Sequence, residues 1–243
     1  PGGSEATLLA LNKNTGEVIW QTAFPGGDEA AYASAIVVEA DGVRQYVQML
    51  QGGMVGVDAK TGRLLWHYDR AVSRFRANVP TPLARNNLIY WASAGTGGGV
   101  IRLKANGADV EAEEVCFSPK LPTSIGGSVL VGGHLYSTGR ESMQCVEFAT
   151  GTVKWQERGI GAASLCLADG RLYLHGENGE VALVKPAADG YVEKGRFSPP
   201  DQPKRRSQME KAWVYPVVAS GRLYIRDLQM LWCYDVKAPS APK

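Results

Sequence analysis

The sequence predicts an all-β protein built from repeated, four-stranded antiparallel sheets. Three stretches share one sequence motif, which we call the Thr-Gly phrase. In it a polar turn residue is followed by Thr-Gly, and a tryptophan lies four residues after the glycine. Their glycines are Gly16, Gly62 and Gly151, spaced 46 and then 89 residues apart, or one and then two steps of a common period. A fixed period of about 45 residues is typical of repeat architectures.

A second phrase recurs between copies of the first and consists of an apolar strand, a tight turn and a strand that carries a tyrosine. The tyrosines are Tyr46, Tyr90, Tyr136, Tyr173 and Tyr224, spaced 44, 46, 37 and 51 residues apart. Gly and Asn residues supply the turns because they tolerate the left-handed backbone region. Each period therefore contains two hairpins, or four short strands, which indicates the blade of a β-propeller.

The strands of each blade, named A to D from the inside outward, can be assigned along the chain in order. The chain opens on strands C and D in residues 7–24 and ends on strands A, B and C in residues 214–236. Between them we expect four whole blades, in residues 33–69, 80–117, 125–158 and 162–197. Two of these keep the turn glycine, Gly107 or Gly190, without the tryptophan that follows, and are predicted to be degenerate. We therefore predict one propeller array over residues 1–243, with about five to six blades, as part of a larger ring.

Composition agrees with this fold and narrows the function. The chain has 243 residues, of which 44% are hydrophobic and 29 are Gly, enough to bury a core between sheets. A net charge of +2 lacks the dense basic character of nucleic-acid binders, so we expect no nucleic-acid partner. No run of 18 apolar residues occurs, so we expect no transmembrane segment. The chain begins at Pro1 without an initiator Met, which suggests processing or excision from a longer protein.

The cysteines and histidines show no spacing typical of metal or catalytic sites. Cys145 and Cys233 occupy equivalent repeat positions, which predicts small buried side chains on strand C, and a disulfide among the cysteines stays open. His67, His134 and His175 are each expected at a surface or strand-end position. We accordingly predict no catalytic residue and no metal site.

Loops between blades and between strands B and C carry arginines and aromatic residues of the kind found at binding hot spots. The candidate binding face comprises Arg74, Arg76, Asn78, Arg140, Glu141, Lys211, Trp213 and Tyr215. Two basic clusters, Arg70 to Arg76 and Lys204-Arg205-Arg206, are interpreted as solvated loops, with contact to an anion or an acidic partner as the alternative.

The repeated runs Ala10 to Trp20 and Val57 to Trp66 resemble the repeat of the pyrroloquinoline-quinone (PQQ) enzyme superfamily, the quinoprotein alcohol dehydrogenase-like proteins, whose members form eight-bladed propellers. The C-terminal run Gly221 to Asp227 is typical of PQQ-binding-like β-propeller repeat proteins. These are similar to the lipoprotein of the outer-membrane β-barrel assembly machinery. The resemblance implies an eight-bladed ring and a location in the periplasm or cell envelope.

Two functions follow from this resemblance. The quinone dehydrogenases hold their cofactor between a Trp and a disulfide of adjacent cysteines, beside calcium, whereas this sequence has no adjacent cysteines. Its repeated Trp20, Trp66 and Trp155 are predicted to lie on outer D strands and to lock blade to blade. We therefore expect a non-catalytic scaffold for a protein or peptide partner, without cofactor. The alternative is a PQQ- and calcium-dependent enzyme that oxidises alcohols or sugars, and self-association through incomplete ring edges is a further expectation.

Overall fold

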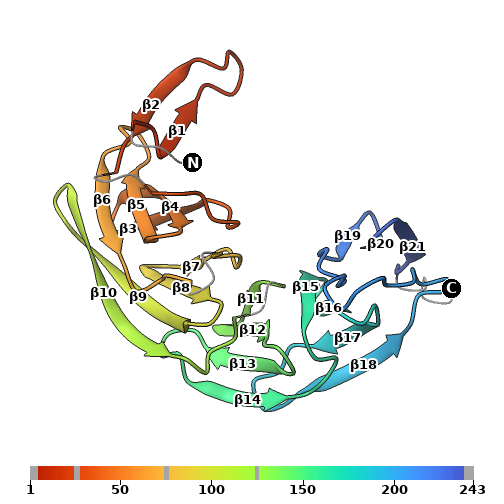
Figure 1. Ribbon diagram of the computed structural model, residues 1–243. Coiled ribbons are helices and arrows are strands. Elements are labelled where there is room, and N and C mark those ends of the chain that lie inside the picture. The colour runs from red at the N-terminus through yellow and green to blue at the C-terminus, as the bar shows by residue number, and fades with distance from the viewer. Residues whose placement is uncertain (1–4, 25–27, 74–76, 124–125, 238–243) are drawn as a thin grey trace, which may run out of the picture. The chain divides into compact units, whose positions relative to one another are not determined.

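The computed structural model describes residues 5–24, 28–73, 77–123 and 126–237, and within these residues every regular element is a β-strand (Figure 1). The strands form six antiparallel sheets, each made of strands consecutive in sequence. Four sheets have four strands, the first has two and the last has three. This confirms the predicted fold class, with four-stranded blades that number about five to six.

The sheets follow the predicted order along the chain. The first contains β1 (Leu8–Leu11) and β2 (Val18–Thr22), and the second β3 (Ile36–Ala40), β4 (Val43–Leu50), β5 (Gly53–Asp58) and β6 (Leu64–Tyr68). The third contains β7 (Leu83–Arg85), β8 (Leu88–Ser93), β9 (Gly97–Asn106) and β10 (Asp109–Ser118), and the fourth β11 (Ser128–Val131), β12 (His134–Thr138), β13 (Met143–Glu147) and β14 (Val153–Glu157). The fifth contains β15 (Ala163–Ala168), β16 (Arg171–Gly176), β17 (Val181–Lys185) and β18 (Val192–Phe197), and the sixth β19 (Val217–Ala219), β20 (Arg222–Asp227) and β21 (Met230–Asp235).

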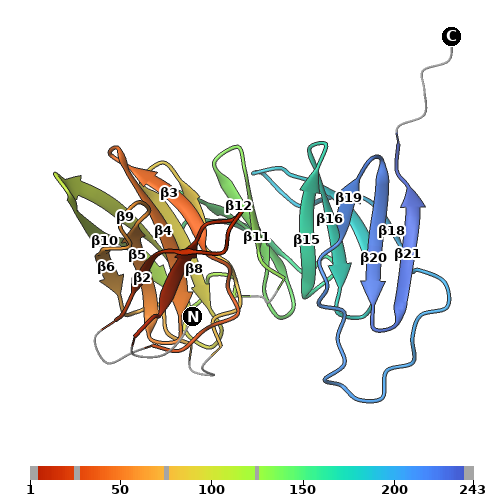
Figure 2. The same ribbon diagram turned by 90° about the horizontal axis from the view of Figure 1, so that it is seen from above.

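The chain divides into two compact units. The first unit comprises Pro1–Thr123 with Phe148–Thr152, and the second comprises Ser124–Glu147 with Val153–Lys243. In the first unit the largest core cluster joins buried side chains of sheets two and three, such as Met49 and Trp91. In the second unit the corresponding cluster joins sheets four and five, including Leu165 and Leu174. Each unit therefore buries apolar side chains between neighbouring blades, as Figure 2 shows for the stacked sheets of each.

The repeated Thr-Gly phrase forms the turn between strands C and D. In the second sheet the carboxylate oxygen of Asp58 accepts hydrogen bonds from the backbone N–H groups of Lys60 and Thr61, at 3.0 and 2.7 Å. Gly62 then adopts a φ of +73°, a conformation that glycine reaches without a steric penalty. Asn12 and Gly16 repeat this arrangement in the first sheet, because Asn and Asp side chains bond their own backbone in tight turns.

Each complete C–D pair has a register irregularity that brings one D-strand residue opposite the middle of strand C. In chain order these residues are Trp20, Trp66, Cys116, Trp155 and Gly195. The tryptophan position thus exists in the two degenerate copies as well, where a cysteine or a glycine fills it. The predicted degeneracy therefore concerns the side chain and leaves the strand in place.

The tryptophans lie on outer strands, as predicted, and two of them bond to the next sheet. Trp20 Nε1 donates to the Ala59 carbonyl at 3.2 Å, and Trp155 Nε1 donates to the Ala187 carbonyl at 2.8 Å. Trp66 differs, because its Nε1 donates within its own sheet to Gln45 Oε1 at 2.5 Å. The ring of Trp66 is nevertheless buried in the cluster shared with the third sheet.

Three predicted placements of single residues require comment. Cys145 is fully buried on β13, as expected, but Cys233 is exposed on β21, so that prediction was wrong. The reason is that β21 has no D strand beside it within the described residues. His175 lies next to the end of β16, but it is completely buried. All four cysteines are free thiols.

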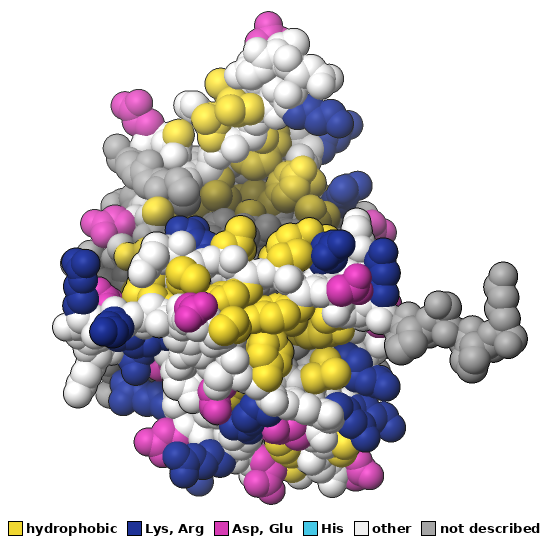
Figure 3. Space-filling view, turned by 90° about the vertical axis from the view of Figure 1, so that its right-hand side faces the viewer, with side chains coloured by type: hydrophobic (Ala, Val, Ile, Leu, Met, Phe, Trp, Pro, Cys, Tyr) yellow, Lys and Arg dark blue, Asp and Glu magenta, His cyan; other side chains and the backbone are white. Residues whose placement is uncertain are grey.

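The last sheet leaves apolar side chains uncovered. Hydrophobic side chains gather on the face of the molecule where β19–β21 lie (Figure 3), and Leu231 of β21 is 67% exposed. The described residues contain no helix with the length and hydropathy needed to cross a membrane.

Candidate functional site

The structure distributes the predicted binding face unevenly. Arg74 and Arg76 lie outside the described residues. Asn78 is completely buried, and its Nδ2 donates to the carbonyls of Leu50 and Ala71 at 2.6 and 2.9 Å. Its Oδ1 accepts a hydrogen bond from Ser93 Oγ at 2.5 Å. Asn78 is therefore a structural residue of the first unit, and its inclusion in an exposed face was wrong.

The remaining five predicted residues belong to the second unit. Arg140 and Glu141 are exposed in the loop between β12 and β13. Lys211, Trp213 and Tyr215 lie in the long connection between β18 and β19, residues 198–216, which we call the strap. The strap has no strand of its own, so its position depends on the bonds it makes to the blades.

Its C-terminal part is bonded to the fifth sheet. Ser164 Oγ donates to the Trp213 carbonyl at 2.9 Å, and His175 Nδ1 lies 3.3 Å from the Val214 carbonyl oxygen. The indole Nε1 of Trp213 donates to Glu177 Oε1 at 2.9 Å. Consecutive strap residues are thus fixed by two side chains of β15 and β16 and by the turn that follows β16.

Its middle part is bonded to the sixth sheet through Arg205. The guanidinium donates to both carboxylate oxygens of Asp227, at 3.3 and 2.7 Å, and to the Glu210 carbonyl at 3.0 Å. The Asp227 side chain is only 1% exposed. The sequence analysis interpreted the basic cluster around Arg205 as a solvated loop. The structure shows instead that Arg205 neutralises a buried carboxylate.

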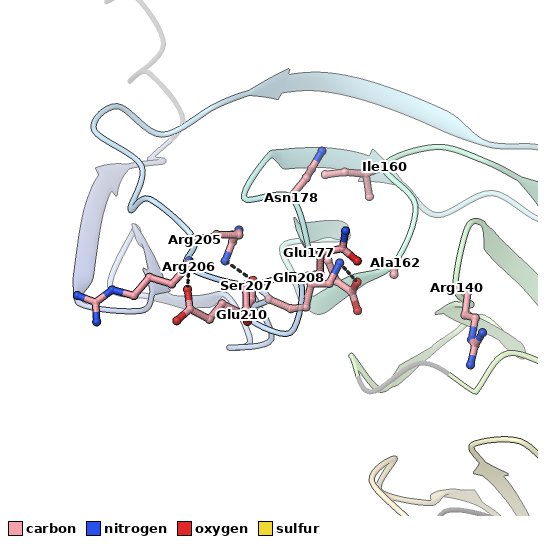
Figure 4. Close-up of a pocket in the computed structure, with 11 residues that line it drawn as sticks. Arg140, Ile160, Ala162, Glu177, Asn178, Arg205, Arg206, Ser207, Gln208 and Glu210 are labelled. Carbon is pink, nitrogen blue, oxygen red and sulfur yellow. Dashed lines mark hydrogen bonds and ion pairs between the residues drawn. The ribbon is translucent and has the colours of Figure 1, made fainter.

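The strap and the loops of the fourth and fifth sheets line a groove of about 670 Å³. Figure 4 shows strap residues Arg205 to Glu210 on one side and Arg140 on the other, with Ile160 and Asn178 between them. Lys211 lines the same groove, where its Nζ lies 3.4 Å from Glu177 Oε2. The structure thus brings Arg140 and Lys211 to one groove. Trp213 does not line this groove, but its indole N–H donates to Glu177, which does.

A second groove of about 950 Å³ shares Arg140, Ile160 and Asn178 with the first. It adds Glu141 and Arg158 from the loops around it. The two together form the strap groove, a continuous concave surface with charges of both signs. Sequence reasoning missed Glu177, Arg205 and Asp227 as its supports, because their pairing depends on where the strap folds.

Burial changes the acid–base behaviour of two residues near the strap. Desolvation lowers the pKa of His175, partly opposed by its hydrogen bond to Val214 and by the charge of Asp227. Desolvation also raises the pKa of Tyr215, which therefore stays a neutral phenol. Neither side chain adds a charge to the groove at neutral pH.

The described residues do not fit the site of a quinone and calcium. Within them no three His, Cys, Asp or Glu side chains gather to hold a metal ion. The four cysteines are free thiols at separate positions in the sequence, so the disulfide of adjacent cysteines cannot form. The chain therefore lacks the pair of adjacent cysteines that holds the quinone in the enzymes it resembles.

The repeated four-stranded sheets define a class of protein, namely a β-propeller. The chain belongs to the family described as outer membrane protein assembly factor BamB, whose model matches residues 2–194. The strap and the sixth sheet lie beyond the matched residues. The family match therefore covers the residues of the strap groove up to 194 and does not extend to the strap.

Two solved structures share the fold. The chain is similar to the computationally designed protein Ika8, with a TM-score of 0.60 and 8% identity over 97% of this chain and 67% of that one. It is also similar to Hsv2 of Kluyveromyces lactis, with a TM-score of 0.55 and 9% identity over 88% and 69%. BamB from Moraxella catarrhalis aligns with 14% identity over 93% and 77%, at a TM-score of 0.48. No curated protein matches the sequence.

Proposed function

We propose that this chain is a non-catalytic β-propeller scaffold that binds a protein or peptide partner through the strap groove, in the bacterial cell envelope. The observation that carries the proposal is the attachment of the strap at both ends. Ser164 and His175 hold it to the fifth sheet, and Asp227 holds it to the sixth. A groove wall fixed before binding loses less conformational entropy when a partner binds.

The chemistry of the groove suits a polypeptide. Arg140 and Glu141 offer opposite charges at one side, so a partner with polar side chains of both signs can pair with them. Trp213 and Tyr215 lie on the strap, outside the residues that line the grooves, and are 39% and 45% exposed. Partly exposed aromatic rings are common anchors at protein interfaces.

The cellular location and the biological process that we propose rest on the family to which the chain belongs. The family name refers to assembly of outer membrane proteins, and it supports the proposal of a periplasmic scaffold in that process. We propose that the scaffold acts without a bound quinone. Self-association through the uncovered side of β21, where Leu231 is exposed, is a separate proposal that size-exclusion chromatography at increasing concentration can test.

Site-specific photo-crosslinking in the native host tests the binding role. A photoreactive residue replaces Gln208, which is exposed in the groove, and a control replaces Asn106, which is exposed at the end of β9. We expect one discrete crosslinked partner from position 208 and none from position 106. Arg140→Glu should lower the yield at 208 about tenfold, equivalent to about 1.4 kcal/mol, whereas Arg102→Glu on β9 should not change it. Equal crosslinking from both positions contradicts a specific groove.

A further inference from the structure

His175 occupies an unusual position for a titratable residue. Its ring is completely buried, and Nδ1 lies 3.3 Å from the Val214 carbonyl oxygen. A carbonyl only accepts, so Nδ1 carries the proton of the neutral ring. Nε2 is then a bare acceptor, and it is buried with no hydrogen-bond partner among the described residues. The neutral ring therefore makes one hydrogen bond, and that bond is one of those that hold the C-terminal part of the strap.

The charges that surround the ring oppose each other. Asp227 from β20 favours a proton on His175, while Arg205 from the strap disfavours it. Both oxygens of Asp227 already accept hydrogen bonds from Arg205. On β15 and β17 the residues paired with His175 are Ser164 and Val181, and neither is charged. A protonated ring would thus carry a second N–H at Nε2, a buried position that has no hydrogen-bond partner among the described residues.

We infer that His175 is a proton-sensitive latch: its neutral ring holds the strap at Val214, and protonation in acid releases the strap and opens the groove. This regulation rests on the binding function proposed above for the same groove. The release is local, because the strap contributes no strand to the sheets. Partner binding should therefore weaken in acid while the blades stay folded.

The sign of the effect follows from linkage. Burial lowers the pKa of His175 in the closed state, whereas the ring in an opened strap returns to about 6.5. The open state then binds more protons, so the closed state loses stability as the pH falls below about 6.5. The open fraction rises by up to about tenfold per pH unit, until the pH reaches the pKa of the closed state.

Hydrogen exchange of the strap tests this without any partner, so failure of the latch and failure of the binding function are distinguishable. Backbone amides of residues 204–215 are compared at pH 7.5, 6.5 and 5.5, with labelling times scaled for the intrinsic rate. We expect protection of these amides to fall several-fold from pH 6.5 to 5.5, while amides of β12 and β13 keep theirs. Unchanged strap protection across this range would overturn the inference.

Two variants separate His175 from general acid effects. His175→Asn keeps a donor near the position of Nδ1 but cannot be protonated, so strap protection should no longer depend on pH. His67→Asn, at an exposed histidine of β6, should behave as wild type. If His175→Asn fails to fold, NMR titration of the wild-type ring decides the question, because the ring and the strap amides must titrate together. Retained pH dependence in His175→Asn, or separate titrations, would refute the latch.

Discussion

Arg205 and Asp227 form a two-pronged ion pair that joins the strap to the sixth sheet, with Nη1–Oδ1 and Nη2–Oδ2 distances of 3.3 and 2.7 Å. The carboxylate is almost entirely buried, at 1% exposure. A charge in such a place is stable only while its partner is present. The pair therefore fixes the strap more firmly than a surface ion pair could.

Arg205→Met should lower the free energy of unfolding of the second unit by about 3 kcal/mol, because it leaves Asp227 buried without a counter-charge. Urea unfolding followed by tryptophan fluorescence measures this change. The control is Arg63→Met, which removes an exposed pair with Asp109 and should cost under about 1 kcal/mol. Equal effects of the two substitutions would show that the strap ion pair is not important for stability.

Gly62→Ala should destabilise the first unit much more than Gly16→Ala. Both glycines have a positive φ, +73° and +76°, so both substitutions cost about 1 kcal/mol in backbone strain. An added Cβ at Gly62 would also lie 2.5 Å from Cε3 of Trp20, whereas at Gly16 it meets nothing within 4 Å. Thermal unfolding of both variants gives the difference, which we expect to exceed about 1 kcal/mol. Equal midpoints would show that Trp20 does not rest on Gly62.

Asn78→Ala should cost about 3 kcal/mol or more, because it leaves the Leu50 and Ala71 carbonyls without a buried donor. Asn87→Ala removes an exposed bond to Asp41 and should cost under about 1 kcal/mol. Denaturant titration of both variants measures the two losses. A marginal loss for Asn78→Ala, together with loss of partner binding, would restore Asn78 to the binding face.

The period of the sequence predicted the blades because the C–D turn is a local structure. Asp58 bonds the backbone within three residues, and Gly62 needs only its own positive φ, so both signals are visible in a short stretch. The position of Cys116 was harder to assign, because it follows its turn glycine, Gly107, by nine residues, whereas Trp20 follows Gly16 by four. Its equivalence to Trp20 appears only in the strand pairing.

The candidate site was less predictable because it depends on long-range contacts. Arginine and aromatic content singled out Arg140, Lys211 and Trp213, and the first two do line one groove. The burial of His175 could not be inferred from residue content, because it depends on a contact with Val214 of the strap, 39 residues away in the sequence. Only the folded chain shows that Asp227 neutralises Arg205.

We propose that the chain is a binding scaffold and holds no quinone. Titration calorimetry of PQQ in the presence of calcium tests it most directly, with a quinoprotein dehydrogenase as the positive control. We predict no saturable heat from the folded protein under conditions in which the control binds. Saturable, calcium-dependent binding at micromolar concentration or tighter would contradict the account and would indicate oxidation of alcohols or sugars.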